Sequence, residues 1–386
     1  MNVWRRLLLS AVGGVAVSGV YAAQPVLEPM GRSLGVPAGL TGWLVAAGQF
    51  GYLAGLLLLV PLGDVVDRRR LIAGHLAVTA AGAALTASAT AGWAAFAGLG
   101  AAGAFAVVVQ TTVAYAASVS PPAERGRAIG VVTSGVVVGI LGARVVTGAL
   151  AENWGWRSVY AVLAVLSLLL AALVLAVLPP EERAGPPVRY RQAVGSLGGL
   201  FGQRVFLTRG LTAFFLFASF GTLWSGLSLP LAGPPWELSE GRIGLFGLAG
   251  LAGALGAVRA GRWADAGRAA PVSGGALVLL LLSWAAIAQL PRSLWLLAVG
   301  IVVLDFAVQA VHVSSQHLLT TVRPDRPSGV IGGYMVFYSL GSALGAAATT
   351  ALFTAHGWTG SSLLGAGFAA CALAVWAADR WLPSRP

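Results

Sequence analysis

A short charged stretch, Gly63-Asp64-Val65-Val66-Asp67-Arg68-Arg69-Arg70, separates two apolar runs at 40–62 and 71–90. A shorter version of it, Ala264-Asp265-Ala266-Gly267-Arg268, stands between two later apolar runs, with its acidic residue 201 positions further on. A charged turn that recurs at such a distance indicates that the chain contains a duplicated unit.

A second landmark repeats at nearly the same distance. Gly155-Trp156-Arg157 returns as Gly357-Trp358-Thr359, 202 residues later. The stretch 179–205, rich in Pro, Gly and Arg, is the one sizeable hydrophilic interruption between the two copies. We therefore predict an N-terminal bundle at 1–178 and a C-terminal bundle at 206–386, joined by a linker loop at 179–205.

The composition places both copies in a membrane. Apolar residues make up 57% of the chain, charged residues only 10%, and the mean hydropathy is +0.82. A soluble domain carries roughly 25% charged residues, whereas a bilayer favours apolar helices of about 20 residues. We predict an all-α membrane protein whose twelve helices form two six-helix repeats, with apolar segments near 7–23, 40–62, 71–90, 93–118, 128–150, 158–178, 210–231, 242–262, 272–290, 294–321, 330–354 and 360–378.

The arginines predict the orientation in the membrane. If the N-terminus lies in the cytoplasm, 19 of the 24 basic residues fall at cytoplasmic ends and loops. The outer loops hold Arg32, Arg157, Arg242 and Arg292, and Arg144 lies within a helix. By the positive-inside rule, both termini face the cytoplasm of a bacterial inner membrane. We expect the first segment to be retained, because its cleavage as a signal peptide would reverse this topology.

The repeated charged turn resembles the loop between helices 2 and 3 of the major facilitator superfamily, and the resemblance extends over the whole chain. The family pattern is Gly-x-x-x-Asp-Arg-x-Gly-Arg-Arg. Residues 60–69 keep the acidic residue and the two final basic residues, but have Val60, Val65 and Asp67 at the other three motif positions. The resemblance implies the fold of that family, in which helices 1, 4, 7 and 10 line a central cavity.

Three further runs are similar to the 12-helix drug:proton antiporters of bacteria. They are Gln49-Phe50-Gly51-Tyr52, SGVVVGILGAR at 134–144 and AGPPWELSEGRIGLFGLAG at 232–250. Helix 5 has Gly142-Ala143-Arg144 where the antiporter motif has a Gly-Pro pair, and helix 4 lacks the arginine that many such antiporters carry.

Small residues at four-residue spacing occur in helices that are repeat equivalents. Gly51 and Gly55, Gly135 and Gly139, and Gly341 and Gly345 are such pairs in helices 2, 5 and 11, and helix 8 carries Gly at 244, 247, 250, 253 and 256. Small residues let membrane helices approach closely, so ordinary packing explains them. In the resembled fold these helices also line the seam between the halves, where rocking exchanges inward and outward access.

The charged turns are candidates for a conformational latch. A carboxylate at the positive end of a helix gains roughly 0.3–1 kcal/mol. We expect Asp64 to face the start of helix 11 near Ser328-Gly329, with Asp265 as its counterpart in the second half; a solvated turn charge is the alternative for each. The full set assigned to the latch is Asp64, Arg68, Arg69, Asp265 and Arg268.

Only two charged residues lie deep in the predicted segments, Arg144 and Asp305. A charge at the bilayer centre costs about 2.5–3.5 kcal/mol on insertion scales and needs a cavity or a partner. Helix 10 also carries a polar stripe, in which Asp305, Gln309, His312 and Gln316 follow one face at helical spacing. We assign proton coupling to Asp305, His312 and Arg144; an anchor to backbone carbonyls is the alternative for Arg144.

The substrate cavity is predicted from the polar and aromatic residues of the four cavity-lining helices. Aromatic side chains there suit planar or amphipathic organic substrates, although core packing explains each one alone. The predicted cavity residues are Tyr21, Gln24, Gln110, Tyr115, Trp224, Gln309 and Gln316.

The function expected from these features is secondary active transport of a small organic molecule by alternating access. Proton-coupled efflux is the first reading, and proton- or sodium-coupled uptake of a nutrient or metabolite is the alternative. The chain shows no paired catalytic carboxylates, metal-ligand cluster or phosphate-binding loop, so we expect no enzymatic activity, no cofactor and no metal. We expect a monomer in the lipid bilayer with no nucleic-acid partner.

The topology can be tested by cysteine accessibility. In a Cys371→Ala background, single cysteines introduced into loop 179–205 should react with membrane-impermeant maleimide only from the cytoplasmic side. Labelling of that loop from the periplasm would contradict the predicted orientation.

Overall fold

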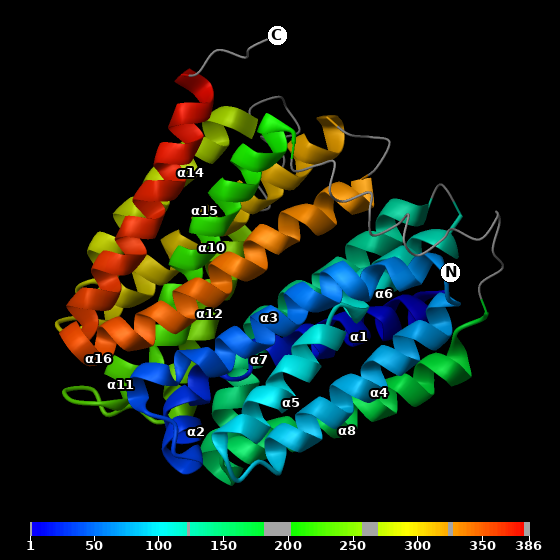
Figure 1. Cartoon of the computed structure of the whole chain (residues 1–386), viewed down its shortest axis with the longest axis horizontal. Helices are drawn as coiled ribbons and strands as arrows, with labels where there is room; N and C mark the ends of the chain where they lie inside the picture. The colour runs from blue at the N-terminus through cyan, green and yellow to red at the C-terminus, as the bar shows by residue number, and fades with distance from the viewer. Residues whose placement is uncertain (1, 122–123, 181–201, 257–268, 323–326, 382–386) are drawn as a thin grey trace. The chain divides into compact units, whose positions relative to one another are not determined.

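The protein is described here by a computed structural model that covers residues 2–121, 124–180, 202–256, 269–322 and 327–381 (Figure 1). Throughout these ranges the chain is helical and forms no β-strand. Its longer helices are α1 (Val3–Tyr21), α2 (Leu27–Leu34), α3 (Gly42–Leu58), α4 (Arg68–Ala87), α5 (Gly92–Phe105), α6 (Val108–Ser118), α7 (Arg125–Trp154), α8 (Trp156–Val177), α10 (Arg204–Gly226), α12 (Glu240–Gly256), α14 (Ala269–Ile287), α15 (Leu294–Val322) and α16 (Pro327–Trp381). The short helices are α11 (Ser228–Ala232), η1 (Gln24–Val26), η2 (Ala38–Leu40) and η3 (Val60–Asp64).

The helices have the length and apolarity of membrane spans. Ten segments of the described chain are long and apolar enough to cross a bilayer. One of them, Val330–Arg380, contains two helical arms that meet at Gly357, and α12 contributes 17 further residues. The predicted all-helical membrane fold is confirmed, and this pattern is consistent with twelve crossings.

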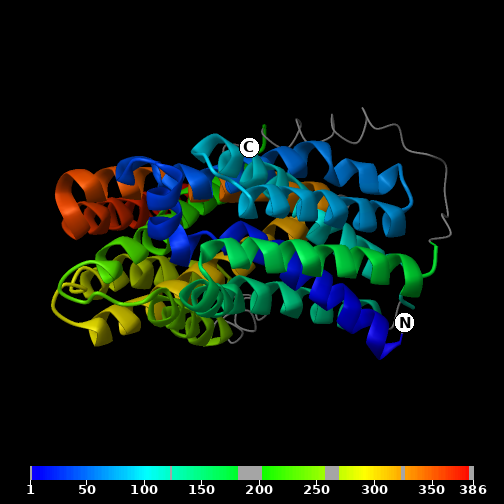
Figure 2. The ribbon, with the colours of Figure 1, turned by 90° about the horizontal axis from the view of Figure 1, so that it is seen from below.

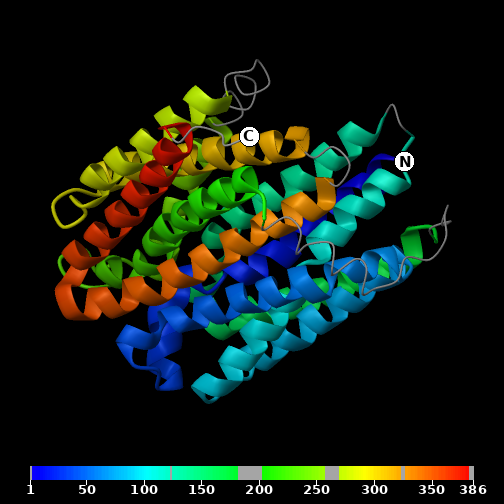
Figure 3. The same cartoon turned by 45° about the horizontal axis from the view of Figure 1, so that its top comes forward.

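The chain reverses direction inside α16 without a loop. Gly357 has φ 62° and ψ −159°, a conformation that L-residues with a Cβ rarely adopt. The ribbon of α16 shows two arms joined at a sharp bend (Figures 1 and 3). Hydrogen bonds cross the bend: Thr349 Oγ1 donates to Ser361 Oγ at 3.1 Å, and Ser361 Oγ donates to the Thr349 carbonyl at 3.2 Å.

One predicted segment, 93–118, is two helices in the structure. The amide of Ala106 is shared between the carbonyls of Ala102 and Gly103 (3.0 and 3.1 Å), and Gln110 N bonds to Val107 O at 2.9 Å. These three-residue bonds tighten the backbone and separate α5 from α6. Apolar periodicity does not reveal such a break, because both sides of it remain apolar.

Asp67, one of the departures from the family turn pattern, has a structural role. Its Oδ1 accepts a hydrogen bond from the Arg70 amide at 2.9 Å, which caps the first turn of α4. An N-cap carboxylate satisfies an amide that no helical carbonyl can reach. The aspartate therefore begins α4 where the family pattern has glycine.

The chain divides into two compact units. Unit 1 comprises Met1–Pro37, Trp43–Gly195 and Ser239–Gly244, and unit 2 comprises Ala38–Gly42, Ser196–Leu238 and Leu245–Pro386. The division between the large segments falls inside the stretch 179–205, of which residues 181–201 lie outside the described ranges.

Within unit 1, glycines bring helix backbones into direct contact. A Cβ on Gly51 of α3 would collide with the carbonyl oxygen of Gly100 in α5. In the same way, Gly135 and Gly139 of α7 leave space for the carbonyls of Ser10 and Gly14 in α1. The paired glycines of helices 2 and 5 therefore pack helices of one unit together.

Unit 2 repeats this arrangement. Gly341 and Gly345 of α16 leave space for backbone carbonyls of α10, and Gly253 of α12 leaves space for the carbonyl of Val302 in α15. Counted from the start of each half, second–fourth and first–fifth helix contacts thus occur in both units. The duplication visible in the sequence extends to the contacts between backbones.

Substituting one contact glycine should destabilise unit 1. Gly51→Ala places a methyl group against a backbone carbonyl, and overpacking of this kind costs about 1–3 kcal/mol. Gly74→Ala on α4 is the matched control, because a Cβ there meets nothing within 4 Å. We expect Gly51→Ala alone to lower the unfolding free energy in detergent; equal stabilities would contradict the packing described here.

Candidate functional site

Unit 1 contains a buried guanidinium held by a glutamine. Arg144 of α7 is 1% exposed. Its Nη2 and Nε donate to Gln24 Oε1 at 2.9 and 3.2 Å, and its Nη1 donates to the Ile140 carbonyl at 3.2 Å. The guanidinium carbon also lies 5.5 Å from the centroid of the Tyr21 ring. Three residues that the sequence assigned to coupling and to the cavity thus form one cluster.

The end of α1 positions this acceptor. Residues Gln24–Val26 form the turn η1 directly after α1, with Pro25 setting the backbone at its second position. The turn directs Gln24, which is 3% exposed, towards α7. Because 120 residues separate Gln24 from Arg144, local pattern alone could not predict this contact.

Further polar side chains extend the cluster into α3 and α6. Gln49 hydrogen-bonds to the Tyr21 hydroxyl, and Gln110 Nε2 donates to Tyr52 OH at 3.2 Å. Gln49 is 1% exposed, and its Oε1 has no hydrogen-bond partner among the described residues. Gln49 and Tyr52 were not predicted as site residues, although both stand in the run Gln49–Tyr52 quoted for the family resemblance.

Tyr115 lies apart from the Arg144 cluster. Its ring is fully buried, and its hydroxyl donates to the Pro179 carbonyl at 2.8 Å. This bond fastens α6 to the residues that follow α8. Of the cavity residues predicted in this half, Tyr21, Gln24 and Gln110 are therefore placed in or beside the cluster, whereas Tyr115 anchors the bundle.

Unit 2 buries the only acidic side chain that the sequence placed deep in a helix. Asp305 of α15 is 1% exposed and faces the glycines of α12. A Cβ on Gly250 would lie 3.3 Å from Asp305 Oδ2 and 2.8 Å from the Trp224 ring, and one on Gly253 would lie 3.1 Å from the aspartate Cβ. Because the glycines of α12 have no side chain, they leave the space that the carboxylate of Asp305 and the indole of Trp224 occupy.

His312 lies two turns along α15 in a cage of aromatic rings. Its Nδ1 is 3.1 Å from Tyr334 OH, and Gln316 Nε2 is 3.2 Å from its Nε2. The Phe217 ring meets the imidazole edge-on at 5.2 Å between centroids. If the glutamine amide donates to Nε2, then the neutral imidazole carries its proton on Nδ1 and donates it to the tyrosine hydroxyl.

The polar stripe of α15 is thus directed in part at the first arm of α16. Gln309 is half-buried, like His312 and Gln316, whereas His317, which the helical spacing puts on another face, is exposed. Tyr334 was missed by sequence reasoning, because a single tyrosine in an apolar helix carries no signal of its own.

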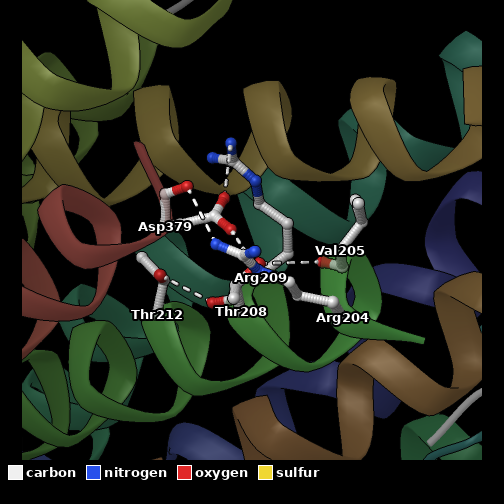
Figure 4. Close-up of polar contacts among 6 residues, drawn as sticks. All are labelled: Arg204, Val205, Thr208, Arg209, Thr212 and Asp379. Atoms are coloured by element: carbon white, nitrogen blue, oxygen red, sulfur yellow. Dashed lines mark hydrogen bonds and ion pairs between the residues drawn. The ribbon is translucent and has the colours of Figure 1, made fainter. Parts of the chain in front are cut away.

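An ion-pair cluster joins the start of α10 to the end of α16 (Figure 4). Arg204 Nε lies 3.6 Å from Asp379 Oδ1, and Arg209 Nη2 lies 4.0 Å from Asp379 Oδ2. Arg204 Nη2 also donates to the Asp379 carbonyl at 3.3 Å. Arg209 is 9% exposed, so it is more deeply buried than expected for one of the cytoplasmic arginines of the positive-inside pattern.

The latch residues are only partly visible. Asp265 and Arg268 lie outside the described residues, as does the side chain of Asp64. Arg69 Nη2 donates to the Leu175 carbonyl near the end of α8, which fastens the start of α4 within unit 1. Arg68 is half-buried at the first position of α4. The latch remains a prediction.

No metal site accompanies these clusters. In the ranges that the structure covers, no group of three or more His, Cys, Asp or Glu side chains is placed to hold a metal ion. The chemistry available here is that of hydrogen bonding, one buried carboxylate, one imidazole and fixed guanidinium groups.

An all-helical chain with membrane-length spans and buried polar clusters inside each half has the architecture of a polytopic membrane transporter. The profile of the Major Facilitator Superfamily matches residues 9–239, and the chain belongs to this family. It is 41% identical over 371 residues to the "Uncharacterized transporter YgaY" of Escherichia coli O157:H7, with 96% of this chain and 94% of the relative covered. It is 32% identical over 309 residues to the "Chloramphenicol resistance protein" of Streptomyces lividans, covering 74% and 72% of the two chains.

Solved structures share the fold at low identity. A bacterial homologue of the human lysosomal transporter Spinster, in an inward-facing and unoccupied conformation, superposes with a TM-score of 0.80 at 17% identity, covering 99% of this chain and 98% of that one. A point mutant of the nucleoside transporter NupG gives a TM-score of 0.80 at 15% identity, covering 97% and 99%. This family moves small molecules across membranes, in agreement with the expectation that the chain is not an enzyme.

Removing the acceptor of the buried guanidinium should destabilise unit 1. Gln24→Leu leaves two donors of Arg144 without their partner, and hydrogen bonds to charged groups are worth about 1.5–3 kcal/mol. Gln110→Leu, which removes one neutral bond from a half-buried residue, should cost less. The double variant Gln24→Leu/Arg144→Leu should recover part of the loss in unfolding free energy. Strict additivity of the two single changes would show that the pair is not coupled.

Proposed function

We propose that the chain is a proton-coupled exporter of small amphipathic organic molecules, with Asp305 as the group that carries the proton. The observation that carries this proposal is the burial of a carboxylate, 1% exposed, in the middle of an apolar helix beside Trp224. An ionised carboxylate is expensive in such surroundings, and it becomes neutral by binding a proton. Alternating hydration of the site would let it load a proton on one side and release it on the other.

His312 and Tyr334 form the next part of the proposed proton path after Asp305. The imidazole lies two turns from Asp305 and is bonded through both nitrogens, to Tyr334 and to Gln316. A histidine with two partners can accept a proton on one nitrogen and release one from the other. We assign His312 to this relay and Tyr334 to holding its tautomer.

The Arg144 cluster is assigned to the substrate. It combines a fixed positive charge, two tyrosines and glutamine amides, which suit an organic molecule with an aromatic face and hydrogen-bonding groups. The relative named for chloramphenicol resistance supports export of a molecule of this kind. In this proposal Arg144 shares its guanidinium between Gln24 and the substrate instead of binding a proton.

Alternating access gives the remaining parts their roles. We assign 1–178 and 206–386 to the two moving halves and 179–205 to a cytoplasmic linker, with both termini in the cytoplasm of a bacterial inner membrane. Asp64 and Asp265 would hold the cytoplasmic side closed in the outward-open state. We propose a monomer as the working form.

Asp305→Asn should separate binding from coupling. The amide keeps the shape of the carboxylate but cannot titrate, so the variant should bind substrate yet fail to concentrate it. A sensitised strain tested against amphipathic antibiotics, chloramphenicol among them, would identify the compound. Its transport in proteoliposomes with an imposed pH difference would then be measured.

Glu237→Gln is the matched control for this experiment. It removes an exposed acidic residue of the same unit that lies between α11 and α12, so gradient-driven transport should persist. If Asp305→Asn still concentrates the compound, the coupling group lies elsewhere or the driving ion is not the proton. Counterflow in oriented vesicles would distinguish export from the uptake alternative.

A further inference from the structure

Unit 1 carries a narrow groove on one side of its bundle. Three helices line it: α1 from Leu7 to Ala22, α7 from Val131 to Leu150 and α8 from Val159 to Leu166. These helices lie together in the bundle, with α1 crossing α7 and α8 (Figure 2). All of these residues belong to unit 1.

The dimensions of the groove favour an extended chain over a helix as its occupant. Its volume is about 680 Å³. The stretch from Leu7 to Ala22 is about 22 Å long at 1.5 Å per residue, so the mean cross-section is about 30 Å² and the width about 6 Å. A helix with side chains is about 10–12 Å across, whereas an extended hydrocarbon chain is thinner. The groove is also longer than half of the ~30 Å hydrocarbon core, so it suits one chain in extended form.

The lining of the groove is mostly apolar, and few of its hydroxyl groups are free to donate a hydrogen bond to an occupant. The Ser18 hydroxyl donates to the carbonyls of Gly14 and Gly139, at 2.7 and 3.1 Å, and the Ser134 hydroxyl donates to the Gly130 carbonyl at 2.9 Å. The backbone contact between α1 and α7 closes the floor, because Gly135 and Gly139 leave no gap against Ser10 and Gly14. An occupant therefore enters from the side of the bundle and cannot pass through the floor.

A positively charged side chain stands just beyond one end of the groove, outside its lining. Arg127 stands one turn before Val131 on the same face of α7, and it is exposed with no ion-pair partner among the described residues. Trp4, which is 76% exposed, stands one turn before Leu7 on α1. Arg6 at this end is already paired with Glu124, which leaves the charge of Arg127 available. An indole and a guanidinium at the end of an apolar channel fit the headgroup level of a membrane.

We propose that this groove binds one anionic phospholipid, with an acyl chain along α1 and α7 and the phosphate on Arg127. The chain fills the space that three helices leave open, and the guanidinium selects a negatively charged headgroup. One arginine near a membrane surface is worth a preference of about fivefold for an anionic over a zwitterionic lipid.

Native mass spectrometry of the delipidated full-length protein tests this assignment. Palmitoyl-oleoyl phosphatidylglycerol should form one tight adduct at about fivefold lower concentration than phosphatidylcholine with the same chains. Val138→Trp, at a residue that is 63% exposed in the groove, should weaken both adducts at least tenfold. Arg127→Gln should keep the adduct but remove the preference for phosphatidylglycerol.

Two further variants keep the test decisive. Leu166→Trp fills the groove from α8 and should reproduce the loss if Val138→Trp does not fold. Leu282→Trp, at a 59% exposed residue of α14 in unit 2, adds the same indole elsewhere and should change nothing. The proposal is overturned if both groove variants bind the lipids as tightly as the wild type does, or if the wild type binds the two lipids equally well. It is also overturned if the groove variants change the amount of protein dimer and leave the lipid adducts unchanged.

Discussion

The fold depends on helix backbones that touch where glycine removes the side chain. Inside a bilayer, apolar side chains gain nothing by leaving lipid for protein, so van der Waals contact and hydrogen bonding hold helices together. Here the carbonyl oxygens of Gly100, Ser10 and Gly14 occupy positions that a Cβ would take on the facing helix. The same device in unit 2 makes room for Asp305 and Trp224. One constraint thus explains both the packing of each half and the placement of its buried polar groups.

The two halves use this common scaffold for different chemistry. In unit 1, the permanently charged guanidinium of Arg144 is hydrogen-bonded to the neutral amide of Gln24. Unit 2 instead contains Asp305 and His312, whose charges can change. The backbone contacts recur in both halves, whereas the side chains beside them differ. The proposed function uses this difference: it assigns substrate recognition to the fixed cation in one half and proton carriage to the titratable pair in the other.

Much of this could be predicted from the sequence, because the bilayer imposes simple rules. Apolar length predicted the spans, and helical spacing predicted that Asp305, His312 and Gln316 share a face. Contacts between distant segments could not be predicted: the bond from Arg144 to Gln24 and the partner of His312, Tyr334, depend on which helices lie side by side. The break between α5 and α6 was missed because it rests on backbone hydrogen bonds and leaves no trace in composition.

The bend at Gly357 closes a triangle of contacts in unit 2. The first arm of α16 is fastened to the middle of α10, where Gly341 and Gly345 meet its backbone, and the second arm is fastened to the start of α10 through Asp379. Three rods joined at three points form a braced triangle, which cannot shear unless one joint breaks. The ion pair at Asp379 is then the third corner of this triangle: it holds the end of the second arm against α10, so the bend at Gly357 is not the only connection between the two arms.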